Sequence, residues 1–121
     1  MTQNQNSKRY DLEERTFQFA KNIAIYVRTL PKTIPNAECS VQVVRSSGST
    51  GANYIEANEA LSKKDFLMRI KICRKEAKES AYWIRLIVET NDDGCAKDGL
   101  KLLEEARELK KIFSAIHSNS T

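Results

Sequence analysis

Apolar residues recur along this chain at intervals of three and four, which is the spacing of one face of an α-helix. The pattern predicts four helices, over residues 11–30, 37–61, 62–90 and 96–116. Runs of β-branched residues are short, and Gly and Pro are scarce, so nothing favours a sheet. Because the connections are short, we expect an all-α, antiparallel up-down-up-down four-helix bundle.

The same spacing predicts which side chains face the interior of the bundle. In the first helix these are Ala20, Ile23, Val27 and Leu30, flanked by Phe17 and Ala24. In the second helix the seam is Ala37, Val41, Val44, Gly48, Gly51 and Ile55. The third helix keeps a heptad register through Phe66, Ile70, Cys73, Ala77, Ser80, Ile84 and Ile87. The fourth turns Leu102, Ala106, Leu109, Phe113 and Ile116 inward.

Capping residues and turn signals set the ends of these helices. Asn36 follows two prolines and is expected to cap the second helix, and Ser62 the third. The Asn-Asp-Asp-Gly sequence of residues 91–94 predicts a turn. We expect one bundle domain over residues 11–117, a disordered polar tail over 1–10 and a frayed tail over 118–121.

Charge and cysteine content narrow the class of protein only slightly. A net charge of +4 permits an anionic partner such as RNA or DNA, although many other proteins carry as much. Cys39, Cys73 and Cys95 show neither disulfide-framework nor metal-binding spacing. The polar N-terminus does not resemble a signal peptide, and no apolar run is long enough to span a bilayer. We therefore expect a cytoplasmic protein without a membrane partner.

The third helix carries a row of basic side chains on one flank of its core face. This basic row consists of Lys64, Lys71, Lys75, Lys78 and Arg85, with Arg74 at its border. Cations at seven-residue intervals stay in line on a helix, so the row could bind nucleic-acid phosphates without reading sequence. The alternative is a solvated face, with Lys75 paired to Glu79 and Arg85 to Glu89.

The opposite flank of the third helix is apolar. It consists of Met68, Ile72, Trp83 and Leu86. A helix in a monomeric bundle needs a single apolar stripe, so a second one predicts burial against another subunit. The alternative is a wide core face that continues toward a neighbouring helix.

Residues 45–57 read RSSGSTGANYIEA and are rich in small side chains. Because Gly costs about 1 kcal/mol relative to Ala in a helix, such a segment indicates that another backbone packs closely against it. The polar stripe beside its glycines consists of Arg45, Ser49, Asn53 and Glu56. We expect these residues to form a hydrogen-bonded network reaching Tyr82 or Glu79, the alternative being a binding or catalytic role.

The chain offers little for catalysis. Its single histidine, His117, lies near the C-terminus, outside the expected bundle interior. Inward Glu-x-x-His pairs of the kind that hold di-iron are missing from the sequence, and the glycines are not followed by GK[ST]. We therefore expect a non-enzyme with no catalytic residue, metal or cofactor.

Short sequence motifs in the second and third helices resemble those of a known family. The pieces are RSxxSxGANYxEA, the KxDF step and KEAxExxYWxRL, and the resemblance extends from about residue 10 to residue 116. They resemble the bacterial four-helix-bundle proteins associated with 23S rRNA intervening sequences, sometimes labelled as ribosomal proteins. Thr50 departs from this pattern, because the family usually has an apolar residue there, and Gly48 is smaller than usual.

The resemblance implies a four-helix bundle that assembles as a homopentamer and has no established enzymatic activity. Together with the basic row, it predicts a homo-oligomeric protein that associates with nucleic acid, RNA in particular. The alternative is a protein-interaction scaffold or an accessory subunit of a partner enzyme.

Overall fold

The structure, a computed structural model, describes the backbone of residues 2–121 and the side chains of residues 11–121. It contains four α-helices and, within that range, no strand. The helices are α1 (Thr2–Arg28), α2 (Ile34–Asn58), α3 (Lys63–Thr90) and α4 (Asp93–Ser120). The prediction of an all-α chain of four helices is therefore confirmed.

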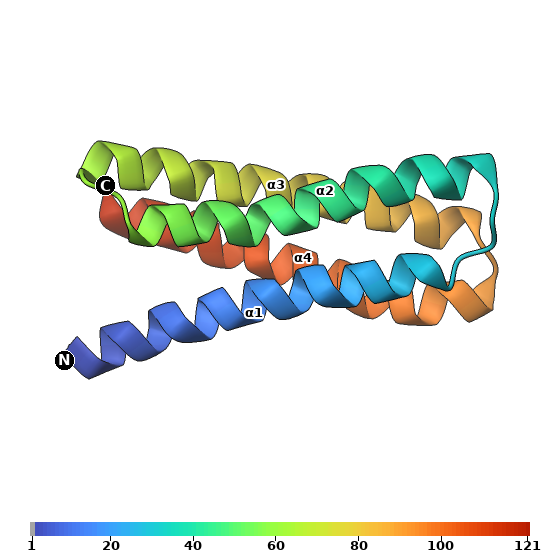
Figure 1. Cartoon of the computed structure of the whole chain (residues 1–121), viewed down its shortest axis with the longest axis horizontal. Coiled ribbons are helices and arrows are strands. Elements are labelled where there is room, and N and C mark those ends of the chain that lie inside the picture. The colour runs from blue at the N-terminus through green and yellow to red at the C-terminus, as the bar shows by residue number, and fades with distance from the viewer. Residues whose placement is uncertain (1) are drawn as a thin grey trace.

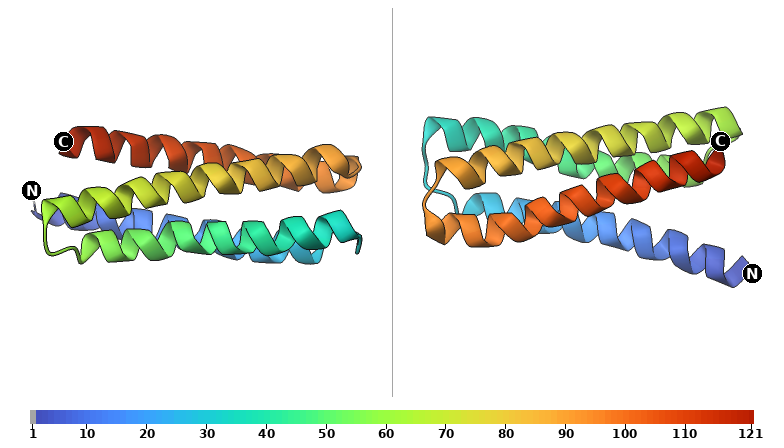
Figure 2. Two further views of the ribbon diagram at one scale, coloured as in Figure 1. Left: turned by 90° about the horizontal axis from the view of Figure 1, so that it is seen from above. Right: turned by 180° about the vertical axis from the view of Figure 1, so that it is seen from behind.

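The four helices lie lengthwise beside one another, with their connections at alternate ends (Figure 1). α3 packs extensively against both α2 and α4, whereas α1 packs against α2 and only slightly against α4. Figure 2 shows α1 leaning away from α4 toward the N-terminus. The α2–α3 pair and the α3–α4 pair therefore supply most of the packing.

The helix starts follow local capping chemistry. Ser62 caps α3 as predicted, because its Oγ accepts the Asp65 N–H at 3.0 Å. The prediction that Asn36 caps α2 is wrong, since Thr33 does so, accepting the Asn36 N–H at 3.2 Å. Pro35 occupies the first turn, where its missing N–H costs no hydrogen bond.

Asn36 instead joins the two connections at one end of the molecule. Its buried side chain donates to the Pro31 carbonyl at 2.8 Å and to Asn91 Oδ1 at 2.9 Å. Asn91 Nδ2 donates back to Asn36 Oδ1 at 2.8 Å. This reciprocal amide pair fixes the α1–α2 connection against the α3–α4 connection.

Both expected tails lie largely within helices. α1 begins at Thr2 and α4 continues to Ser120, beyond the predicted bundle limits of 11 and 117. Neither tail contains Gly or Pro, so no residue in them ends a helix. Met1, which belongs to the predicted tail, lies outside the described residues, as do the side chains of residues 2–10.

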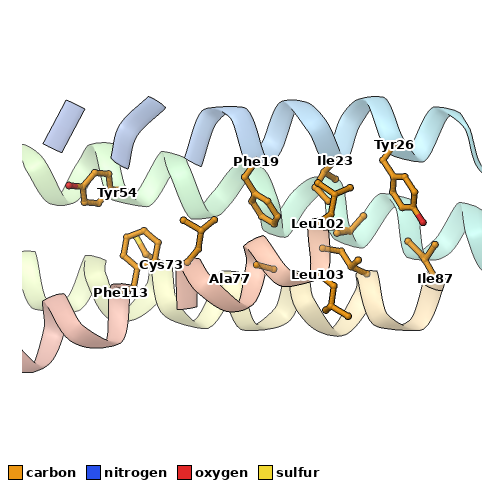
Figure 3. Packing of buried hydrophobic residues seen from close by; sticks show 14 of the residues in the cluster. Phe19, Ile23, Tyr26, Tyr54, Cys73, Ala77, Ile87, Leu102, Leu103 and Phe113 are labelled. Carbon is orange, nitrogen blue, oxygen red and sulfur yellow. The ribbon is translucent and has the colours of Figure 1, made fainter. Parts of the chain in front are cut away.

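The predicted inner faces of α3 and α4 are confirmed. The α3 heptad positions from Ile70 to Ile87 are fully buried, and Phe66 at the helix start is half-buried. In α4, Leu102, Ala106, Leu109 and Phe113 are buried. Figure 3 shows Ile87 of α3 and Leu102 of α4 on the sides of their helices that face α1. The Tyr54 and Phe113 rings lie 5.7 Å apart and join α2 to α4.

The predicted face of α1 is rotated slightly from the observed one. Ile23 and Leu30 are buried as expected, whereas Phe17 is 60% exposed. Among residues 11–28, the other buried positions of α1 are Leu12, Thr16, Phe19 and Tyr26. Thr16 is accommodated because its hydroxyl donates to the Glu13 carbonyl at 3.0 Å.

The predicted seam of α2 is wrong. Val41, Val44 and Ile55 are 58%, 45% and 51% exposed, so this apolar stripe faces outward. The buried face of α2 consists instead of Asn36, Cys39, Val43, Ser46, Ser47, Thr50, Tyr54 and Ala57. The polar members are tolerated because hydrogen bonds satisfy them.

Two of these bonds show how a polar helix face enters the core. Ser46 Oγ and Ser80 Oγ lie 2.8 Å apart, joining α2 to α3. Thr50, which departs from the family pattern, is fully buried and donates to the Ser46 carbonyl at 2.9 Å. The apolar periodicity of α2 therefore marks an exposed face of the helix and not its buried one.

The glycines show where helices approach closely. A Cβ on Gly51 would lie 3.1 Å from Thr16 Oγ1, so α1 packs tightly there, as the small-residue segment predicts. A Cβ on Gly48 would meet nothing within 4 Å. A Cβ on Gly99 would lie 2.5 Å from both Tyr26 Oη and Val88 Cγ2, a close approach that periodicity did not reveal.

Candidate functional site

The basic row occupies the outer side of α3, because the heptad register turns the opposite side into the core. Its four lysines, Lys64, Lys71, Lys75 and Lys78, are exposed, as is Arg85, whereas Arg74 is half-buried. From Lys64 to Arg85 the row spans roughly 30 Å at the usual helical rise. The sequence-predicted members therefore lie together along one helix.

Few carboxylates neutralise this row. Arg85 Nε lies 2.8 Å from Glu89 Oε2, and both side chains are more than 60% exposed. The Glu89 hydrogen bond raises the pKa of Arg85. The pair expected between Lys75 and Glu79 does not form, and no described carboxylate lies within ion-pair distance of the four lysines.

The apolar flank of α3 contains two half-buried and two exposed residues. Met68 is 50% exposed and Leu86 37% exposed, while Ile72 and Trp83 are half-buried. Trp83 packs against the core cluster, which agrees with the alternative of a wide core face for this residue. Its Nε1 points to Glu79 Oε1 at a long 3.5 Å.

The aromatic ring next to Trp83 is the most exposed one on α3. The Tyr82 and Trp83 ring centroids lie 4.9 Å apart with an interplanar angle of 83°, an edge-to-face arrangement. Tyr82 is 61% exposed. The tyrosine is therefore held by a partly buried neighbour while most of its own surface remains open.

The polar stripe of α2 forms a smaller network than expected. Asn53 Nδ2 donates to the carbonyl and to Oγ of Ser49, both at 2.9 Å. Asn53 Oδ1 accepts Arg69 Nη1–H at 3.0 Å. The network thus reaches α3 through Arg69, which the sequence reading did not single out, and not through Tyr82 or Glu79.

Arg45 and Glu56, the other members of the stripe, are exposed. Neither makes a hydrogen bond or an ion pair among the described residues. Burial and the neighbouring Glu79 raise the pKa of Glu76, while Lys75 and Arg45 lower it, so Arg45 lies within electrostatic reach of Glu76. The arrangement supports a structural role for Ser49 and Asn53.

The outward stripe of α2 is a surface that the sequence reading assigned to the core. It consists of Ala37, Val41, Val44, Gly48 and Ile55, and we call it the α2 outer stripe. The signal was present in the sequence, because these residues do share one helical face. What sequence reasoning missed was that this face points away from the bundle.

The cysteines and acidic residues form no metal-binding arrangement. Over residues 11–121, no group of three or more His, Cys, Asp or Glu side chains converges to hold a metal ion. Cys39 and Cys73 are buried, and burial raises the pKa of the Cys73 thiol to about 12. Among the described helices, none is long and apolar enough to cross a membrane.

The chain is similar to a known protein family and to a solved structure. A comparison with curated proteins finds no match. Among solved structures, the chain is similar to a protein of unknown function from the S23 ribosomal protein family of Bacteroides thetaiotaomicron. The two are 26% identical, with a TM-score of 0.78, over 92% of this chain and 98% of that chain. The model of the 23S rRNA-intervening sequence protein family matches residues 8–115. The chain therefore belongs to the 23S rRNA-intervening sequence protein family.

Proposed function

We propose that this protein is a non-enzymatic, cytoplasmic homo-oligomer that binds RNA through the basic row of α3. The observation that carries the proposal is the exposure of Lys64, Lys71, Lys75 and Lys78 on one helical face without carboxylate partners. Nucleic-acid phosphates fit such a row, because binding releases the counterions condensed on the nucleic acid. The family's description, which refers to sequences within 23S rRNA, is consistent with an RNA ligand.

The helix geometry favours contact with a backbone over recognition of sequence. The lysines at positions 64, 71 and 78 recur every seven residues, so successive ammonium groups stand roughly 10 Å apart along α3. Each ammonium is a point charge on a flexible stem and does not select a particular base. We therefore expect binding that depends steeply on salt and weakly on RNA sequence.

Self-association is the second part of the proposal. Each subunit exposes two separate apolar surfaces, the α2 outer stripe and, on α3, Met68 and Leu86. Two different surfaces that meet between neighbouring subunits generate a closed ring when the rotation closes. We propose an antiparallel up-down-up-down bundle that assembles in this way. Five subunits is the number that the family resemblance implies.

The α2 outer stripe also favours a second candidate function, an accessory subunit or scaffold for another protein. Val41, Val44 and Ile55 would then contact that partner instead of a second copy. Co-purification from the native cell distinguishes the two functions. A stoichiometric protein that survives nuclease treatment supports the scaffold, whereas RNA without a protein partner supports the main proposal.

RNA binding by variants of the basic row tests the main proposal. Lys71→Ala and Lys78→Ala each remove one exposed charge from the row. Lys21→Ala is the matched control, because Lys21 is also an exposed lysine but lies on α1. Binding of a labelled RNA at low salt is measured by fluorescence anisotropy.

We expect the two row variants to bind the RNA several-fold more weakly than the wild type, and Lys21→Ala to bind as the wild type does. Equal losses in all three variants would mean that net charge, not the row, controls binding. Absence of RNA binding by the wild type at low salt would refute the proposal.

A further inference from the structure

Tyr82 lies within the basic row. It stands four residues after Lys78 and three before Arg85, so all three side chains share one face of α3. Each of the three is exposed, and the tyrosine is 61% exposed. A cation, an aromatic ring and a second cation therefore follow one another along the helix surface.

The ring of Tyr82 is constrained by its neighbour. It makes an edge-to-face contact with Trp83, with centroids 4.9 Å apart, and Trp83 packs against the core. In an edge-to-face pair, at least one face of the tyrosine ring is left outside the contact. Ordering this side chain for binding therefore costs less than ordering a free surface tyrosine.

Cations alternating with an exposed aromatic ring are the chemistry of single-strand recognition. The cations hold successive phosphates while a base stacks on the ring, and every base offers a face for stacking. A base in a duplex is already paired and stacked, so it cannot use such a platform. Arg85 stays available to a phosphate, because its pair with Glu89 is exposed to solvent and weak.

We propose that Tyr82 stacks on an unpaired base of RNA whose flanking phosphates bind Lys78 and Arg85. The ligand class is then single-stranded RNA, or an unpaired segment of a folded RNA, and not duplex RNA. This inference rests on the proposed function and specifies its ligand.

Burial of Tyr82 between subunits is the competing explanation for an exposed aromatic ring. Lys78 and Arg85 would then lose water together with the ring. Desolvating two cations without new carboxylate partners is costly. Stacking on RNA avoids this cost, because the phosphates neutralise both cations.

The test compares Tyr82→Leu with Tyr82→Phe in the full-length protein. The leucine variant removes the stacking ring, whereas the phenylalanine variant keeps it. The probes are a labelled 12-nucleotide single-stranded RNA, the same RNA annealed to its complement, and the single-stranded DNA of the same sequence. Light scattering reports the mass, and thermal unfolding reports the fold, of each variant.

We expect the wild type to bind the single strand more tightly than the duplex. Tyr82→Leu should weaken single-strand binding by about 5- to 150-fold, the range for loss of one stacked base, and leave duplex binding unchanged. Tyr82→Phe should stay close to the wild type, and both variants should keep the wild-type mass and melting temperature.

Three results would overturn the inference. Single-strand binding by Tyr82→Leu equal to that of the wild type would exclude stacking while leaving the proposed function intact. A lower mass for Tyr82→Leu would place the ring in a subunit interface. Failure of the wild type to bind any of the three probes would overturn the inference together with the proposed function.

Discussion

At the scale of single residues, Tyr26 is a buried polar group whose hydrogen bond stabilises the fold and whose ionisation would destabilise it. Its hydroxyl donates to the Cys95 carbonyl at 2.8 Å, and Gly99 makes room for it. Burial is the largest cause that raises the pKa of Tyr26 to about 12, and the nearby Cys95 and Asp98 add to it. The folded protein therefore favours the protonated phenol.

Tyr26→Phe should change the dependence of stability on alkaline pH. A raised pKa in the folded state means that the wild type is fully stabilised below pH 10 and loses stability as the pH rises from 10 to about 12. The phenylalanine variant lacks this loss. At pH 7 it should be less stable by about 1 kcal/mol, because the hydrogen bond to Cys95 is missing.

Urea unfolding at several pH values between 7 and 11 measures the effect. The free-energy difference between wild type and Tyr26→Phe should stay constant up to about pH 10 and shrink as the pH rises from 10 to 11. A difference that stays constant up to pH 11 would contradict a buried, protonated Tyr26.

At the scale of single helices, two glycines with opposite surroundings give opposite predictions. Gly99→Ala places a Cβ 2.5 Å from Tyr26 Oη and from Val88 Cγ2, so either these side chains or α4 must shift. We expect a loss of about 1–3 kcal/mol, which is typical of overpacking. Gly48→Ala meets no atom within 4 Å and should gain about 1 kcal/mol from helix propensity.

Urea unfolding of the two variants, each the control of the other, checks this pair. If Gly48→Ala proves as destabilising as Gly99→Ala, another backbone must cover Gly48. The glycine would then lie inside a contact between subunits, not on an open helix surface.

The helices also show what sequence reasoning can and cannot recover. The buried residues of α3 are apolar or small, so the heptad register from Ile70 to Ile87 reveals the true face. In α2 two buried polar residues are satisfied by hydrogen bonds: Ser46 bonds to Ser80 of α3, which requires the packed helices, and Thr50 donates to the Ser46 carbonyl within α2 itself. Apolar periodicity could not anticipate them, and it selected the exposed Val41 and Val44 instead.

The wrongly predicted face of α2 also explains why only part of the candidate site could be predicted from the sequence. The exposure of the basic row depends only on the α3 register, so the sequence could predict it for the four lysines and Arg85, whereas Arg74 at the border is half-buried. The partner of Asn53 depends on how α2 and α3 face each other. Arg69 could therefore not be identified until the two helices were seen together.

At the scale of the whole molecule, the exposed apolar surfaces lead to a prediction about mass. Val44→Asp combined with Ile55→Asp puts two charges on the α2 outer stripe, at positions 45% and 51% exposed. Charges there should not disturb the core but should prevent contact with another subunit, because an unpaired charge is costly to bury.

Light scattering should then give the mass of one 13.8 kDa chain for this double variant and a multiple of that mass for the wild type. Leu100→Asp is the control, because Leu100 on α4 is 53% exposed and lies outside both apolar surfaces. Met68→Asp with Leu86→Asp tests the α3 surface in the same way. An oligomer that survives all these substitutions would show that the subunits meet elsewhere.

The most direct test of the central claim is the salt dependence of RNA binding. The logarithm of the binding constant, plotted against that of the salt concentration, has a slope set by the number of phosphates neutralised, about 0.7 per contact for a single strand. A variant with Lys71, Lys75 and Lys78 all changed to Ala should lower the magnitude of this slope by about 2 relative to wild type. An unchanged slope in that variant would show that the basic row of α3 is not where RNA binds.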